Sequence, residues 1–232
     1  MSHAPLAPFD SDADYIQEEV AAAKVVAAKL EAERKLREAL RDEAEGDAPW
    51  LHRSGRATSR VLQGRMLALG TKLAEMRSRT DARMEVHRAD LSRPALGIDR
   101  LSRQYGLTAE ERLVLVFLTI PCIGRELADD VLGSLPCYFN GLSVGNLIQL
   151  AGATAVVDWL RLRRLFHAGA SLRRHGLVFL NQVNGEVGPD LVTAEAKLSV
   201  RAFCTIVGDP GIMTEAELPG RTSPSDDDGS AS

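Results

Sequence analysis

The sequence predicts a mainly α-helical fold with one short β-hairpin, preceded by a long helical hairpin. Of its 232 residues only 5% are aromatic, a composition that favours helices over strands. Apolar residues recur every three or four positions along two long stretches within residues 12–93. Later in the chain, serine and threonine residues that can cap helices precede short apolar runs, and an Asn-Gly pair indicates a turn between strands.

The composition of the chain indicates which cellular environment and which binding partners to expect. The net charge of −4 gives the whole protein no attraction to nucleic acid or to an anionic membrane, so any such contact needs a local basic patch. The first residues lack the basic and apolar regions of a secretory signal. The longest apolar run, Leu113 to Ile120, is far shorter than the roughly 18 residues that span a bilayer. Cys122, Cys137 and Cys204 are expected to be reduced core thiols. We therefore expect a cytoplasmic protein with no membrane contact.

Residues 1–11 contain two prolines and the acid Asp10, and we expect them to be disordered. Residues 12–93 are expected to form a helical hairpin. Its first helix runs from Asp12 to Arg41 and has an alanine-rich apolar seam. The residues of this seam are Ile16, Val20, Ala23, Ala27 and Leu30.

A break at residues 46–49 separates this helix from a second, which is predicted to begin near Thr58 or Ser59. The second helix is rich in arginine, whereas acids dominate the ends of the first, so an antiparallel pair is expected. A strict heptad spacing marks a candidate docking seam. The residues of this seam are Leu62, Met66, Leu69, Leu73 and Met76. The hairpin either packs on the main domain or serves as a docking arm for another protein, and a homo-oligomer through these helices is possible.

Residues 94–209 are expected to form the main domain. A helix that contains Leu96 and Tyr105 stops at Gly106. The segment 108–111 is a capping box, in which Thr108 accepts from the Glu111 amide and the Glu111 carboxylate reaches back. The box identifies the apolar run after it as a buried helix, which Pro121 ends, and another helix follows Gly124.

The second half of this domain combines short helices with a β-hairpin. Ser143 is predicted to cap one helix and Thr154 the longest helix of the domain. The helix that follows Thr154 is expected to bury Trp159, Leu162, Leu165 and Phe166 and to expose Arg161, Arg163, Arg164 and His167. Strands are expected at 177–180 and 195–198, with a type I′ turn at Asn184-Gly185, and Ser199 caps a last helix over 200–207. Residues 210–232 are expected to be a disordered acidic tail. Several helices closed by a short hairpin are the plan of a winged helix.

Three segments resemble the winged-helix domain that precedes the ATPase domain in a group of bacterial AAA+ proteins. These segments are LTAEERLVLVFL (107–118), SLRRHGLVFL (171–180) and SVRAFCTIVG (199–208). Some members of that group are encoded beside contractile injection systems. The resemblance covers about 95–208. It implies a module of such a system without ATP hydrolysis, since the family's ATPase domain should begin where the tail lies here.

Three kinds of reactive site can be compared with the sequence. The string Gly64 to Lys72 departs from a P-loop, because its glycine spacing is one residue too long and its Thr and Lys are inverted. Gly141 to Gly145 is a formal GxSxG, in which Ser143 could be a nucleophile with Asp158 and either His167 or His175. The upstream sequence is helical, however, so a helix cap is the favoured interpretation. The cysteines and histidines form no close pairs of the kind that bind zinc. We expect no cofactor and no metal.

One basic cluster is the remaining candidate site, where a winged helix presents its recognition surface. Its residues are Arg161, Arg163, Arg164, Arg173 and Arg174, with His167 and His175 beside them. Arginines here could neutralise DNA phosphates and read guanine, or dock a protein. The expected wing, residues 181–186, contains no Lys or Arg. The favoured interpretation is therefore a non-enzymatic adaptor or regulatory module that meets an AAA+ ATPase or a larger assembly. The alternatives are a DNA-binding transcriptional regulator and, remotely, a serine hydrolase.

Overall fold

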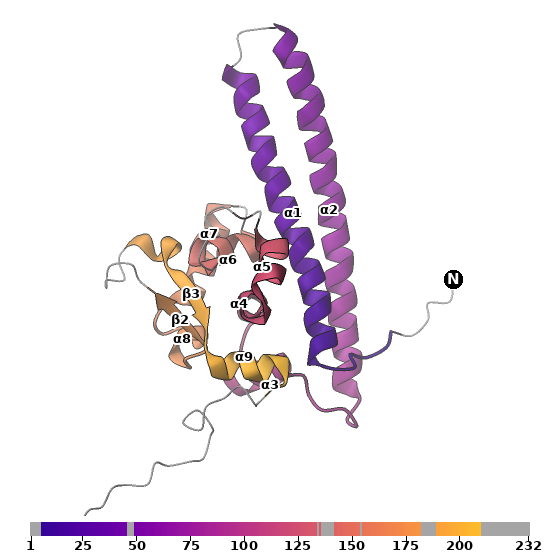
Figure 1. The fold of residues 1–232 in the computed structure, drawn as a ribbon, viewed down its shortest axis with the longest axis vertical. Coiled ribbons are helices and arrows are strands. Elements are labelled where there is room, and N and C mark those ends of the chain that lie inside the picture. Colours follow the sequence, from indigo (N-terminus) through magenta and orange to yellow (C-terminus); the bar gives the residue numbers. More distant parts are fainter. Residues whose placement is uncertain are drawn as a thin grey trace, which may run out of the picture.

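The computed structural model describes residues 6–45, 49–133, 135, 142–153, 155–181 and 189–209. Two long antiparallel helices stand beside a smaller body of short helices and a sheet (Figure 1). Helix α1 is Asp12–Glu45 and helix α2 is Pro49–Ala89. The lower half of α1 lies between α2 and the body, whereas the upper halves of both helices extend away from it (Figure 1). The predicted helical hairpin is confirmed.

The body follows the hairpin in sequence. Its helices are α3 (Gly97–Tyr105), α4 (Ala109–Ile123), α5 (Arg125–Leu132), α6 (Val144–Leu150), α7 (Val156–Arg163), α8 (Ser171–Arg174) and α9 (Val200–Val207). Two 3-10 turns, Arg164–Phe166 and Pro189–Thr193, complete the helical part. Helix α4 is at the centre, and its run from Val114 to Ile120 is at most 3% exposed. The chain is mainly helical, as its composition predicts.

The sheet has three antiparallel strands, β1 (Leu142–Ser143), β2 (Val178–Asn181) and β3 (Glu195–Leu198), in the order β1-β3-β2. Strand β3 lies in the middle, with Leu142 opposite Ala196 and Val178 opposite Leu198. The predicted return strand over 195–198 is confirmed. Strand β1 was not predicted, because two residues are too few to show an alternating pattern. The Asn184-Gly185 turn lies outside the described residues.

Side-chain caps determine where several helices begin. Thr108 and Glu111 form the predicted capping box of α4, with Glu111 Oε2 accepting from the Thr108 amide at 2.9 Å. Ser143 caps α6, where Asn146 supplies the returning carboxamide. Ser199 caps α9 by accepting from the Ala202 amide at 3.2 Å. Each cap satisfies amides that have no partner within the helix. The predicted cap Thr154 lies outside the described residues. At the start of α7, the backbone amide of Ala155 donates to the Asp158 carboxylate at 3.1 Å.

Several local predictions are wrong. The helix after Thr154 was expected to be the longest of the domain, but α7 has 8 residues and α4 has 15. Helix α4 continues through Pro121 to Ile123, so the proline lies in its last turn. Helix α2 begins at Pro49, nine residues before Thr58, because proline suits the first helical position, where its missing N–H would have no partner. Cys122 is exposed, whereas Cys204 is buried and Cys137 lies outside the described residues.

The N-terminal segment also differs from expectation. Residues 6–11 were expected to be disordered, yet Phe9 is fully buried in the main core. Its ring meets Tyr15 edge-on at 5.4 Å, and its carbonyl is 3.0 Å from His87 Nδ1. One aromatic side chain can hold a proline-containing segment whose composition alone indicates disorder.

We predict that Phe9→Ala lowers the free energy of unfolding by about 3–4 kcal/mol, since it leaves a cavity where a buried ring was. Leu6→Ala is the control. Leu6 is 42% exposed, so its truncation should change stability by less than about 0.5 kcal/mol. Urea titration followed by circular dichroism measures both changes. Equal, small effects would show that the segment does not belong to the core.

Candidate partner-binding surfaces

Helix α7 lies between α6 and β2 in the chain, and it contains the first arginines of the predicted basic cluster. It follows α6 after a short turn, and Leu162 and Phe166 anchor its end, at 1% and 0% exposure. Trp159 and Leu165 pack partly against the same core. These four residues are the ones that the sequence predicted to be inward. The opposite side of α7 therefore faces outward.

The outward side of α7 is apolar. Val156 is 75% exposed, Val157 72% and Leu160 58%. In a helix, positions three and four apart lie on one face, so Leu160 neighbours both Val157 and Val156 and joins the three side chains into one surface. Hereafter, "the α7 apolar face" means Val156, Val157 and Leu160. This face was not predicted from the sequence, although the Val-Val pair directly after the expected cap is a signal for it.

The predicted basic cluster is divided by its contacts. Arg161 pairs with Glu110 of α4 at 2.6 Å, Arg163 is half-buried with its Nε enclosed, and Arg173 donates to the Phe166 carbonyl at 3.4 Å. Arg164 and Arg174 are exposed, and neither pairs with a carboxylate among the described residues. Part of the cluster therefore stabilises the body instead of forming one open basic surface.

The Arg161–Glu110 pair also has an electrostatic signature. The Glu110 backbone amide and then Arg161 hold the pKa of Glu110 below its ordinary 4.5. A lowered pKa means that this pair contributes stability above pH 4.5 and loses it as the pH falls through the folded value. Because both side chains are more than a third exposed, solvent screens the pair and its contribution is small.

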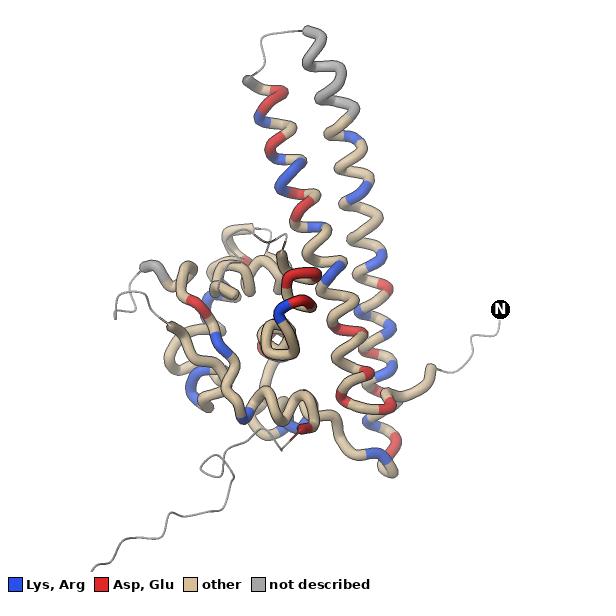
Figure 2. The backbone as a smooth tube through the Cα atoms, in the orientation of Figure 1, with Lys and Arg blue, Asp and Glu red and all other residues tan. Residues whose placement is uncertain are grey.

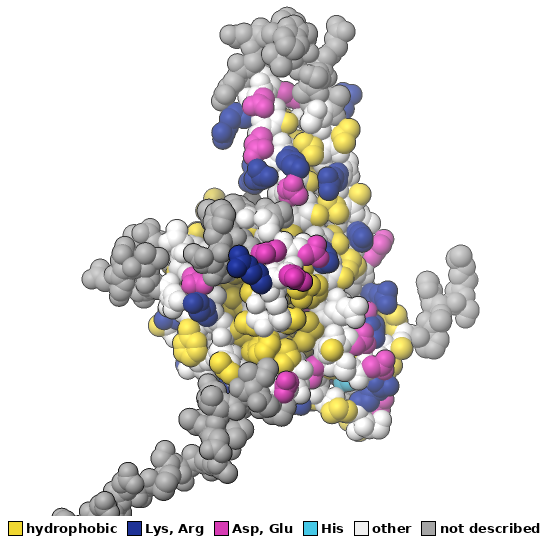
Figure 3. Space-filling view, viewed as in Figure 1, with side chains coloured by type: hydrophobic (Ala, Val, Ile, Leu, Met, Phe, Trp, Pro, Cys, Tyr) yellow, Lys and Arg dark blue, Asp and Glu magenta, His cyan; other side chains and the backbone are white. Residues whose placement is uncertain are grey.

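The predicted docking seam on α2 lies on the inner side of the helical hairpin. Its members Leu62, Met66, Leu69, Leu73 and Met76 are all half-buried. Ser59 and Thr80 continue the same heptad positions, and their hydroxyls donate to α1, to Glu43 at 2.7 Å and to Glu18 at 3.0 Å. The outer side of α2 instead shows Val61 and Leu67, which are 71% and 74% exposed. Hydrophobic side chains run along the helical hairpin of α1 and α2, hereafter the arm, between the charged ones (Figure 3).

Arg83 fastens the two helices at the base of the arm. Its guanidinium pairs with Asp14 at 2.7 Å and with Glu18 at 2.5 Å, and it lies 4.1 Å from the centre of the Phe9 ring. It also donates to the Pro8 carbonyl at 3.1 Å. Burial acts to raise the pKa of Asp14, but hydrogen bonds from the Asp10 amide and Arg83 outweigh it and lower that pKa.

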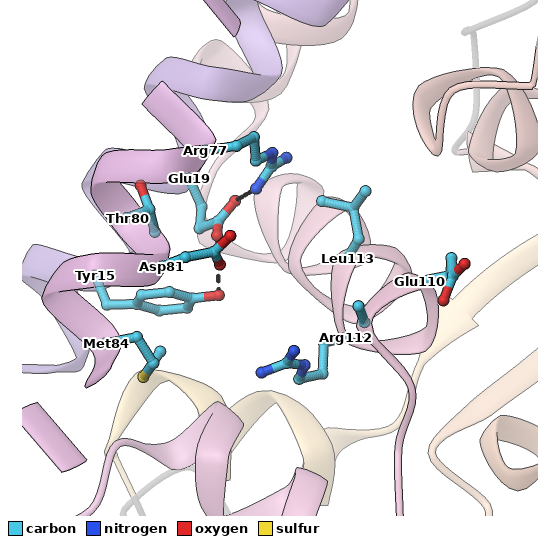
Figure 4. A pocket seen from close by; sticks show the side chains of 10 residues that line it. Tyr15, Glu19, Arg77, Thr80, Asp81, Met84, Glu110, Arg112 and Leu113 are labelled. Atoms are coloured by element: carbon cyan, nitrogen blue, oxygen red, sulfur yellow. Dashed lines mark hydrogen bonds and ion pairs between the residues drawn. The ribbon is translucent and has the colours of Figure 1, made fainter. Parts of the chain in front are cut away.

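A cavity of about 300 Å³ separates the arm from α4 (Figure 4). Inside it, the Tyr15 hydroxyl donates to Glu19 at 3.0 Å, and Glu19 also pairs with Arg77. Burial and then the Glu19 carboxylate raise the pKa of Tyr15 well above its ordinary 10.0. Arg112 projects toward the cavity from the α4 side (Figure 4). On the arm side Tyr15, Glu19 and Arg77 bind one another, although the buried Arg77 Nη2 has no hydrogen-bond partner among the described residues. The cavity lies at the joint between arm and body.

The structure also locates the catalytic and metal-binding alternatives. Ser143 Oγ accepts from the Asn146 amide at 3.1 Å and donates to its Oδ1 at 2.8 Å, so the hydroxyl acts as a helix cap. Gly64 and Gly70 lie within helix α2, where no phosphate-binding loop exists. No group of three or more potential metal ligands occurs among the described residues. Within the same residues, no helix is long and apolar enough to cross a membrane.

We predict that Arg83→Met lowers the free energy of unfolding by about 2–3 kcal/mol, because it removes the cation that pairs with Asp14 and leaves Glu18 with only the more distant, exposed Arg79. Arg79→Met is the matched control on the same helix. Arg79 is 65% exposed and 3.4 Å from Glu18, so its loss should cost less than about 0.5 kcal/mol. Guanidinium unfolding curves compare the two, and equal costs would contradict a special role for Arg83.

Comparison with known families gives one match. The model described as "Winged helix domain, variant" matches residues 1–217, so it includes the helical hairpin as well as the body. No curated protein and no solved structure matches the chain. The matched span is more than half of the chain, and the strand order and helix order agree with that architecture. The protein belongs to the variant winged helix domain family.

Proposed function

We propose that this protein is a non-enzymatic adaptor or regulatory module that acts through protein–protein contacts made by the α7 apolar face. One observation carries the proposal. Helix α7, which we propose as the recognition helix of this winged helix, presents Val156, Val157 and Leu160 to solvent at 58–75% exposure. Apolar surface of this kind is stabilised by burial against another protein, at about 25 cal/mol for each Å². Phe179 on β2, 56% exposed, adds a second exposed apolar side chain to the body.

DNA binding is the second candidate, and the exposed Arg164 and Arg174 favour it. Affinity for DNA comes mainly from cations that neutralise phosphates, and base edges are read by polar side chains. Here Arg161 already pairs with Glu110, and Arg163 is half-buried. Three exposed aliphatic side chains on the recognition helix offer little to phosphates. The balance of contacts on α7 therefore supports a protein partner.

The kind of partner follows from the resemblance to winged-helix domains that accompany AAA+ ATPases. We propose an AAA+ ATPase, or an assembly related to contractile injection systems, as the protein that α7 meets. The projecting part of the helical hairpin is a second candidate contact, through Val61 and Leu67 on its outer side. A homo-oligomer through this arm is an alternative use of the same residues. Winged-helix domains are typically non-enzymatic, and the helix-capping role of Ser143 supports that expectation here.

We predict that Val157→Asp/Leu160→Asp reduces capture of the partner by tenfold or more, because apolar anchors at the centre of an interface contribute at least about 2 kcal/mol. The full chain, tagged and cross-linked in its native cells, is purified, and co-purifying proteins are quantified by mass spectrometry. Arg161→Ala/Arg164→Ala should retain the same partner. Val61→Asp/Leu67→Asp tests the arm separately. Circular dichroism confirms that every variant is folded.

Fluorescence anisotropy with a random 20-base-pair duplex tests the DNA alternative. We expect weak binding, with a dissociation constant no tighter than about 10⁻⁶ M at physiological salt. Tight, salt-dependent binding that is lost in Arg161→Ala/Arg164→Ala, combined with unchanged protein capture by Val157→Asp/Leu160→Asp, would reject the adaptor proposal in favour of a DNA-binding regulator.

A further inference from the structure

One side of α2, the side opposite the seam that packs on α1, is apolar over about four turns. Hereafter, "the α2 outer face" means the six exposed residues of this side, Val61, Gly64, Leu67, Ala68, Thr71 and Ala74. At about 100° of rotation per residue, all six lie within one sector of the helix. Val61 is 71% exposed and Leu67 is 74% exposed. The Thr71 hydroxyl donates to the Leu67 carbonyl at 3.2 Å, so the one polar side chain of this face is satisfied within the helix.

The arm is charged elsewhere, with Lys, Arg, Asp and Glu positions spaced along both of its helices (Figure 2). A helix that packs on one side usually turns a charged side to solvent, whereas a helix with apolar residues on opposite sides is buried on both. Helix α2 has the seam on one side and the α2 outer face on the other. The body lies on the far side of α1 from α2 (Figure 1), and no described part of the chain covers the α2 outer face. A second molecule is therefore needed to cover it.

Gly64 is near the centre of the sector that the α2 outer face occupies. Glycine is one of the least favourable residues in a helix interior, and a close approach by another chain is one reason for its presence there. A Cβ atom at Gly64 would meet nothing within 4 Å, so the packing of this chain alone gives no such reason. With Ala68 one turn later, Gly64 leaves a shallow region between Val61 and Leu67 into which the side chains of another helix fit. The shape of the face therefore suits a helix as its neighbour.

The charges at the two ends of the α2 outer face indicate that this neighbour is a second copy of α2. Arg60 lies at one end of the face and Glu75 at the other, and both are exposed in the same sector of the helix. If two copies lie antiparallel, with residues 67 and 68 at the two-fold axis, Arg60 faces Glu75 of the partner subunit. The symmetry repeats this ion pair at the other end of the contact. A parallel pair would instead bring Arg60 against Arg60 of the partner subunit.

We propose that this protein forms a homodimer in which the α2 outer faces of two copies pack antiparallel against each other. In this register Leu67 lies opposite Ala68 of the partner subunit, and Val61 lies opposite Ala74 of the partner subunit. Each large side chain therefore meets a small one, as close packing requires. The dimer goes beyond the adaptor proposal and does not use the α7 apolar face. It presents two such faces, one on each body, so that it can hold a partner at two points.

Sedimentation equilibrium of the full chain tests the contact. We expect the mass to rise with concentration from 25.1 kDa toward twice that value, with a dissociation constant on the order of 10⁻⁵ M, because one helix face makes a small interface. Ala68→Glu places a carboxylate beside the same carboxylate of the partner subunit and should weaken association about tenfold or more. Gln63→Glu is the matched control, because it adds the same charge to the neighbouring turn outside the face, and it should change the constant by less than about twofold. A chain that stays monomeric up to about 10⁻⁴ M, or a dimer that Ala68→Glu leaves intact, would overturn the proposal.

Charge exchange tests the antiparallel register. Arg60→Glu alone and Glu75→Arg alone each turn two attractions into repulsions, so each should weaken association about threefold to tenfold at low salt, and Arg60→Glu/Glu75→Arg should restore it. The two positions are about 22 Å apart along one helix, so they cannot compensate each other within a chain. Both residues are exposed and are replaced by good helix formers, so the fold is retained. A double variant that associates no better than the single ones contradicts the register, and a dimer that is lost in Val157→Asp/Leu160→Asp would place the interface at α7 instead.

Discussion

The rest of the structure depends on the packing of the lower half of α1 against two partners at once. Ala22, Ala23 and Ala27 are at most 3% exposed, and such small side chains let α1 approach both α2 and the body closely. Ile16 and Val20 join the same core as Leu115 and Phe117 of α4. The alanine-rich sequence, which is too poor in large apolar residues for a self-sufficient coiled coil, suits a helix packed on two sides. The arm and the winged-helix body therefore share one core.

Polar contacts at the edges of that core set the orientation of the arm. Arg83 joins Asp14 and Glu18 across the hairpin, and Glu19, buried to 5% exposure, joins Tyr15 and Arg77 above α4. Buried charges of this kind add little net stability compared with apolar packing, but they allow few alternative arrangements. The match of one family model to both the hairpin and the body agrees with this shared architecture. For function, this means that the orientation of the projecting arm relative to α7 is fixed.

The sequence was most informative where a single residue type determines a local geometry. Thr108, Ser143 and Ser199 predicted helix starts because a side-chain oxygen at that position satisfies free amides. The strand Glu195–Leu198 and the helix Val200–Val207 were predicted with their observed bounds. Burial that depends on distant segments could not be predicted in this way. Phe9 is fully buried and its carbonyl meets His87, which is 78 positions away, and the two-residue strand β1 pairs with β3. On α7, the sequence predicted which side chains face the core, but not that Arg161 would form an ion pair with Glu110.

The most direct test of the shared core is hydrogen exchange of the native full chain, read by mass spectrometry across a denaturant series. If α1 belongs to both parts, amides of residues 15–27 should open only together with those of α4, at the free energy of global unfolding. The upper part of the arm should open at lower free energy. If the amides of residues 15–27 instead exchange at the same low free energy as those of the upper arm, while the amides of α4 remain protected, the hairpin is a separate unit and this account is contradicted.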